Sequence, residues 1–335
     1  MSGHLTGIEA AKLGRIFDHE TFELLLPPLR YLSFQTRGSL RKLSILSVFL
    51  IWCGSVTSQS PVKHLIGVTE IRQEFYEGLG RMYDFDFSGA AARADYLGSH
   101  WPASPWSYIL QANVCWWKMI TGEDNATERK RFQQALKTAG EKLTAANTDE
   151  NLFCRIVIQS LQARYELLQR NYPAALLILK RSDNLPALAE GKQDEYEPFL
   201  LTQGLFQYFL AAAKEKSGLL SFLIRQDADK QKGLECLLQL SRSEDLVLRT
   251  EGNYFLMKIF LEMEDNPRKA QTFSHYLVNQ HPDNLIFRYY DCLISRQLQQ
   301  LAGEPPSGCG GIPADQVKLS VRQRMYLNAL LEQNN

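Results

Sequence analysis

The sequence lacks the surplus of one charge that marks several classes of protein. Its 335 residues include 37 lysines and arginines against 37 aspartates and glutamates, so the formal net charge is zero. A nucleic-acid-binding chain usually carries a basic excess that neutralises phosphates, and an acidic solvating tail needs a run of like charges. We therefore expect no nucleic-acid partner. The hydrophobic content of 45% and the charged content of 22% are ordinary for a folded globular chain.

Signals for strands and for reactive centres are also scarce. No segment alternates polar and apolar residues over the length of a strand, and no Asn-Gly hairpin turn occurs. None of the six histidines is paired at the His-x-x-x-His spacing that puts two ligands on one helix face. His275 and His281 flank a turn and are expected to be polar surface or capping residues. No catalytic, cofactor-binding or metal-binding residue is predicted, and a non-enzymatic function is expected.

An apolar run at residues 43–53 indicates where the protein acts. Arg41 and Lys42 precede the run, and small polar residues follow it. This order is typical of a secretory signal peptide, which we place at residues 39–60, with cleavage near residues 58–60. The run is roughly half as long as a membrane-spanning helix, and a buried core helix is the alternative. The expected location is the periplasm or envelope of a Gram-negative bacterium.

The position of this signal is unusual, because residues 1–38 precede it. These residues have no clear helical period, and one hypothesis is that translation begins at Leu40. Cys53 resembles a lipid-attachment site, but the bulky Trp52 before it disfavours that chemistry. Peripheral association with a membrane is an open alternative.

The cysteines beyond residue 60 are odd in number and widely spaced, so they predict no disulfide framework. Cys115 and Cys236 lie in apolar segments and are expected to be small core residues. Cys309 lies in a glycine-rich stretch and is expected to be exposed, where it could pair or react. The sequence names no partner for it.

From residue 68 onward the pattern is helical. Apolar residues recur at three- and four-residue spacing, as in Ile71, Phe75 and Leu79. Short polar joints that favour turns and caps separate the apolar stretches. The spacing predicts helices at 68–83, 87–99, 104–121, 127–146, 150–169, 173–181, 195–216, 230–241, 246–263, 267–280, 284–301 and 315–332.

Small residues, alanines and prolines recur at intervals of twelve along these helices. The recurring sets are Gly78, Ala90 and Pro102; Ala163 and Ala175; and Ala270 and Pro282. The spacing resembles that of the tetratricopeptide repeat, a helix–turn–helix of about 34 residues. Small residues are expected to let the two helices of one repeat approach closely. The resemblance covers residues 68–300 and is fullest at 71–119 and 244–291.

The segments 204–209 and 232–234 are similar to exported bacterial proteins of this repeat type. The sequence departs from the family pattern where Lys258 replaces a small residue and where 182–203 forms a long joint. The resemblance implies an all-α, right-handed superhelical solenoid of antiparallel helix pairs at 61–302. A Gly/Pro-rich loop at 303–314 and a capping helix within 315–335, carrying Val317, Val321, Met325 and Leu330, follow it.

The resemblance also implies a scaffold whose concave face binds a protein or peptide partner. The alternative is an all-helical small-ligand-binding protein or enzyme with a pocket near residues 182–229. Asp194, Glu195 and Glu197 would supply polar groups to such a pocket. Trp116 and Trp117 point about 100° apart on their helix, so one is expected to fill its own repeat and the other to meet the next.

Overall fold

The computed structural model describes residues 64–144, 146, 148–181, 184–216, 228–305, 308–309 and 318–332. Within these residues every regular element is a helix and no strand is present, which confirms the predicted all-α class. The predicted extension at 1–38 and signal peptide at 39–60 lie outside them. None of the described helices combines the length and hydrophobicity needed to cross a bilayer.

The helix bounds match the predicted ranges closely in most places. In chain order the elements are α3 (Thr69–Tyr83), α4 (Phe87–His100), α5 (Trp106–Lys118), η1 (Met119–Glu123), α6 (Ala126–Lys142), α7 (Asp149–Leu168), α8 (Tyr172–Arg181), α9 (Leu185–Leu188), η2 (Lys192–Asp194), α10 (Pro198–Lys216), α12 (Lys230–Leu240), α13 (Leu246–Lys258), η3 (Ile259–Met263), α14 (Pro267–Gln280), α15 (Leu285–Ala302) and α16 (Val321–Glu332). The long joint at 182–203 contains the short helices α9 and η2.

The last helix begins later than the predicted residue 315. Residues 318–320 are not helical, and the Ser320 hydroxyl accepts a hydrogen bond from the Gln323 N–H at 3.1 Å. The Gln323 side chain accepts one from the Ser320 N–H in return, also at 3.1 Å. This reciprocal capping box starts the helix at the next residue. Leu330 is buried as expected, but Val321 and Met325 are 64% and 69% exposed, and the packed face is completed by Gln323, Leu327 and Leu331.

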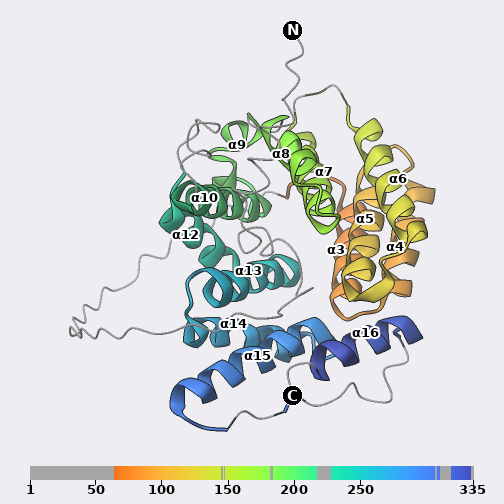
Figure 1. Cartoon of the computed structure of the whole chain (residues 1–335). Coiled ribbons are helices and arrows are strands. Elements are labelled where there is room, and N and C mark those ends of the chain that lie inside the picture. Colours follow the sequence, from red (N-terminus) through yellow and green to blue (C-terminus); the bar gives the residue numbers. More distant parts are fainter. Residues whose placement is uncertain are drawn as a thin grey trace.

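Consecutive helices pack on one another from α3 to α8 and again from α10 to α16. Helices two apart also touch, namely α3 with α5, α5 with α7, and α10 with α13. Figure 1 shows the first run on one side of the molecule and the second run curving around the other. Gly78 makes room for Leu110 of α5, whose side-chain atoms lie nearest to where a β-carbon would stand. The small residue therefore serves packing between α3 and α5, a contact beyond the one expected within a hairpin.

Three joints between helices share one backbone conformation. Phe85, Arg170 and Asp265 have positive φ angles of 56°, 59° and 44°, and each lies two residues beyond the preceding helix. A residue in this left-handed conformation ends a helix by satisfying its last carbonyl groups. Phe85 is bulky for such a position. Its ring is fully buried and stacks on Phe87, so core packing holds the backbone there.

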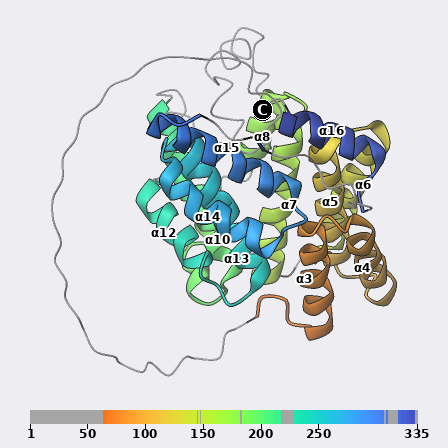
Figure 2. The ribbon, with the colours of Figure 1, turned by 90° about the horizontal axis from the view of Figure 1, so that it is seen from below.

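The two runs of helices meet where α3 contacts α13 (Figure 2). The Tyr83 hydroxyl donates a hydrogen bond to the Glu251 carboxylate. The Asn284 amide donates to the Tyr83 carbonyl oxygen at 2.8 Å. His281 Nδ1 lies 2.7 Å from Asp84 Oδ1. His281 is only 2% exposed and is the C-cap residue of α14, so it takes the expected capping position and not the surface one, and its ring fills the junction between the two runs.

The C-terminal helix closes the same junction from the other side. α16 packs on α15 and also on η1, which belongs to the first run. The Gln323 amide donates to the Thr121 hydroxyl at 2.8 Å, and the Ser320 hydroxyl donates to Glu123. α16 therefore joins the end of the chain to its first half in addition to covering the last helix.

Candidate functional site

A hollow in the described part of the molecule runs along one face of α3. Arg72, Tyr76, Gly80 and Asp84 recur at four-residue spacing, so they share that face. Two neighbouring cavities cover it, with volumes of about 1490 and 510 Å³, and Tyr76 and Asp245 line both. We call the two cavities together the α3 groove. Its opposite wall comes from η2, α10, α12 and α13.

The floor of the groove is apolar. Leu200 and Leu248 line the larger cavity, and they form a small core cluster with Leu240. Tyr76 packs against this cluster from α3. A ligand in the groove therefore has buried apolar surface to contact beneath its polar walls.

The walls carry an excess of negative charge. Nine carboxylates line the two cavities against four lysine and arginine side chains. The carboxylates belong to Glu77, Asp84, Asp86, Asp194, Glu195, Glu197, Glu235, Glu244 and Asp245, and the bases are Arg72, Arg81, Arg242 and Lys318. In a chain of zero net charge, this makes the groove a local region of negative potential.

Part of this charge is neutralised within the protein. Arg81 pairs with Glu77 at 2.9 Å and with Asp86 at 3.1 Å. Burial opposes the ionisation of Asp86, but the Gly89 N–H and the Arg81 guanidinium outweigh it and lower the pKa of that carboxyl. These carboxylates are therefore held as charged, paired groups.

Three other carboxylates have no such pairing. The side chains of Asp194, Glu197 and Glu244 form no ion pair or hydrogen bond with any other described residue. Asp194 and Glu244 are exposed and Glu197 is half-buried. Their negative charges are therefore available to a ligand.

Tyr76 lies where charges from two elements converge. Burial raises the pKa of its hydroxyl well above the ordinary value, and the negative charges of Asp245 and Glu197 raise it further, while Arg72 opposes them. The hydroxyl therefore stays protonated at neutral pH and can donate a hydrogen bond. Gln193 supplies the opposite function, because its Oε1 is buried at the larger cavity without a hydrogen-bond partner among the described residues.

The structure places the residues of the predicted long joint at this groove. Asp194, Glu195 and Glu197 all line the larger cavity. Residues 217–227, the other part of that prediction, lie outside the described residues. The α3 and α13 side chains of the groove were missed, since no local pattern announces that these two helices meet.

Other residues singled out from the sequence serve the interior. Trp116 and Trp117 are both buried, and Trp117 contacts the ring of Tyr83 within the first run and that of Tyr254 across the junction. Lys258, the departure from the repeat pattern, is 2% exposed, and its Nζ lies 3.0 Å from the Tyr290 hydroxyl. These side chains are therefore part of the core and do not form the groove.

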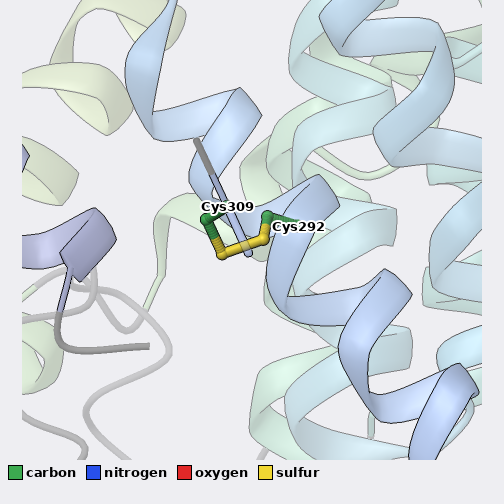
Figure 3. Close-up of a disulfide and its surroundings, with 2 residues drawn as sticks. All are labelled: Cys292 and Cys309. Atoms are coloured by element: carbon green, nitrogen blue, oxygen red, sulfur yellow. A yellow bond between two sulfur atoms is a disulfide. The ribbon is translucent and has the colours of Figure 1, made fainter. Parts of the chain in front are cut away.

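The described cysteines are one disulfide pair and three free thiols; Cys115 and Cys154 are buried, whereas Cys236, which was expected in the core, is only partly buried. Cys309 is joined to Cys292 of α15 by a disulfide, the partner that the sequence did not name (Figure 3). Cys115 is buried, as expected, and burial raises the pKa of its thiol to about 12, with the Glu128 carboxylate adding to the effect. The free thiol is therefore poorly suited to nucleophilic chemistry.

Within the described part of the chain, no group of three or more His, Cys, Asp or Glu side chains is arranged to hold a metal ion. No protein-family model, curated protein or solved structure matches the chain. The case for the α3 groove therefore rests on its own geometry and charges.

Proposed function

We propose that this protein is a non-enzymatic scaffold of tetratricopeptide-like helix hairpins that binds an extended peptide segment of a partner protein. The α3 groove carries the proposal. From Arg72 to Asp84 its α3 wall is about 18 Å long, which accommodates five or six residues of extended chain. The groove combines an apolar floor with polar groups that have no partner among the described residues of the protein. A bound peptide can pack apolar side chains on the floor and form hydrogen bonds and ion pairs with the polar groups.

The recurring joints support the tetratricopeptide-like solenoid. Each positive-φ residue stands seven residues after the small-residue position of the repeat pattern and five before a fully buried alanine. A repeated unit with one fixed joint is what a helical-repeat array requires. The matching sets are Gly78, Phe85 and Ala90; Ala163, Arg170 and Ala175; and Lys258, Asp265 and Ala270.

The size and exposure of the groove favour a peptide over a small ligand. Small-molecule pockets are typically about 300–1000 Å³ and enclose most of their ligand. The larger cavity alone is about 1490 Å³, and many of its lining residues, such as Gln73, Asp194 and Glu244, are exposed. A small-ligand-binding protein or enzyme using the residues near 182–229 is the second candidate.

The disulfide supports the proposed export. Disulfides form and persist mainly in oxidising compartments outside the cytosol. The bond between Cys292 and Cys309 therefore agrees with action in the periplasm or envelope. A partner met there would be another exported protein.

Selection of peptides from a random library, followed by fluorescence anisotropy, tests the proposal. Gln73 is an exposed residue of α3 that lines the larger cavity, and Gln73→Trp would place a bulky ring in that cavity. Gln133 is exposed on α6 and lines neither cavity, so Gln133→Trp is the matched control. We expect Gln73→Trp to abolish binding of the selected peptides and Gln133→Trp to preserve it. Failure to select any peptide, or binding that survives Gln73→Trp, would overturn the proposal.

A further inference from the structure

We infer that the α3 groove selects a segment in which basic side chains alternate with apolar ones. The inference rests on the proposed function and specifies the chemistry of the partner. It depends on three features of the groove: its unpaired carboxylates, its apolar floor, and two side chains at its wall, Tyr76 and Gln193, that can hydrogen-bond the main chain of a ligand.

The unpaired carboxylates come from three elements and converge on one cavity. Asp194 lies in η2, Glu197 lies just before α10, and Glu244 lies between α12 and α13. Like charges gathered in one hollow repel one another, and a cationic ligand relieves that repulsion. The same field disfavours an anionic ligand such as a nucleic acid or an acidic lipid surface.

The basic side chains of the groove offset this field only in part, since Arg72 and Arg242 line the larger cavity together with six carboxylates. Arg81 is engaged by Glu77 and Asp86. Lys318 is 3.3 Å from Asp283, which lines neither cavity. Neutralisation of the carboxylates at η2 and α10 therefore falls largely to the ligand.

The floor and the wall of the groove explain why the segment should also carry apolar side chains and an accessible main chain. Leu200 and Leu248 offer an apolar surface directly beneath the charged rim. The Tyr76 hydroxyl can donate to a main-chain carbonyl of the ligand, and the Gln193 Oε1, which is buried without a described hydrogen-bond partner, can accept from a main-chain N–H once its side chain turns toward the cavity that Gln193 lines. A peptide segment in which basic and apolar side chains alternate can place its charges on the carboxylates, its apolar side chains on the leucines, and its main chain against Tyr76 and Gln193.

Three labelled nonapeptides test the inference by fluorescence anisotropy with the full chain. They are three repeats of Lys-Gly-Leu, of Gln-Gly-Leu and of Glu-Gly-Leu. We expect the lysine peptide to bind at least tenfold more tightly than the glutamate peptide, with the glutamine peptide between them. Because exposed ion pairs contribute modestly, each of Asp194→Asn, Glu197→Gln and Glu244→Gln should weaken the lysine peptide about two- to threefold, and the triple variant about tenfold.

Asp95→Asn is the matched control, since Asp95 is exposed on α4 and lines neither cavity. It should leave all three affinities unchanged. If the glutamine or glutamate peptide binds as tightly as the lysine peptide, and Gln73→Trp blocks it, the inference is wrong while the proposed scaffold function stands. If none of the three peptides binds, or if the triple variant binds the lysine peptide like the wild type, the basic-segment inference is overturned. The library selection decides the scaffold function separately.

Discussion

Asn284 joins the two runs of helices through a single buried amide, and its replacement by alanine should be costly. Its side-chain oxygen accepts hydrogen bonds from the N–H groups of Ile286 and Phe287, both at 3.1 Å, which caps α15. Its side-chain nitrogen donates to the Tyr83 carbonyl oxygen at the end of α3. The residue is 0% exposed, so water cannot replace either partner.

The expected loss follows from these two roles. Removing an N-cap side chain costs about 1 kcal/mol. Leaving the buried Tyr83 carbonyl without its donor costs about 1–3 kcal/mol more. Asn284→Ala should therefore lower the free energy of unfolding by about 2–4 kcal/mol. Asn266 provides the control, because it caps α14 through the Lys269 N–H and makes no hydrogen bond to α3.

Urea denaturation followed by circular dichroism measures both variants against the wild type. Asn266→Ala should lose only about 1 kcal/mol, the contribution of a cap alone. The loss of stability in Asn284→Ser should lie between the losses in Asn266→Ala and Asn284→Ala, because serine keeps a capping oxygen but lacks the amide donor. Equal losses for Asn284→Ala and Asn266→Ala would refute the argument that Asn284 holds the two runs together.

Three further predictions follow from the packing and the chemistry. Gly233→Ala should lower the free energy of unfolding by about 1–3 kcal/mol, because its β-carbon would lie 2.6 Å from a backbone nitrogen of α10. In the control Gly140→Ala the β-carbon would meet nothing within 4 Å, so this variant should be neutral or stabilising. Thermal melts measure both variants. Reduction of the disulfide between Cys292 and Cys309 should destabilise the wild type by about 3 kcal/mol, seen as a lower Tm. It should leave the Tm of a Cys292→Ser/Cys309→Ser variant unchanged. Burial raises the pKa of the Glu251 carboxyl, so the folded state holds its proton more tightly than the unfolded state does. Stability should therefore fall as the pH rises through this raised pKa. In Glu251→Gln, unfolding midpoints measured over the same pH range should lack this pH-dependent fall.

The sequence was sufficient for the helices and for their joints. Periodic apolar residues such as Ile71 and Phe75 gave bounds for α3 within one residue of those observed. Capping side chains such as Asn266 marked where the joints end. These signals are local, because a helix needs only its own apolar face and caps. The start of α16 was missed because the capping box between Ser320 and Gln323 was not recognised.

The groove could be predicted only in part. Asp194, Glu195 and Glu197 stood out because they lie in a joint too long for the repeat pattern. Tyr76 and Asp245 did not stand out, since each lies in an ordinary helix or cap. Their meeting depends on contacts between residues far apart in the chain, and a single sequence carries no signal for such contacts.

The closure of the two runs of helices on each other turns one face of α3 into the wall of a groove. If the runs were apart, the face with Arg72, Tyr76 and Gly80 would be an ordinary solvated helix surface. Asn284 and His281 fix the end of α3 against the second run, so that this face looks across at η2, α10 and α13. A variant that loosens the closure should therefore weaken peptide binding without touching a groove side chain, because only the closed fraction binds. Asn284→Ala measured against Asn266→Ala in the lysine-peptide assay tests this link: equal affinities for the two variants would mean that the groove exists independently of the closure.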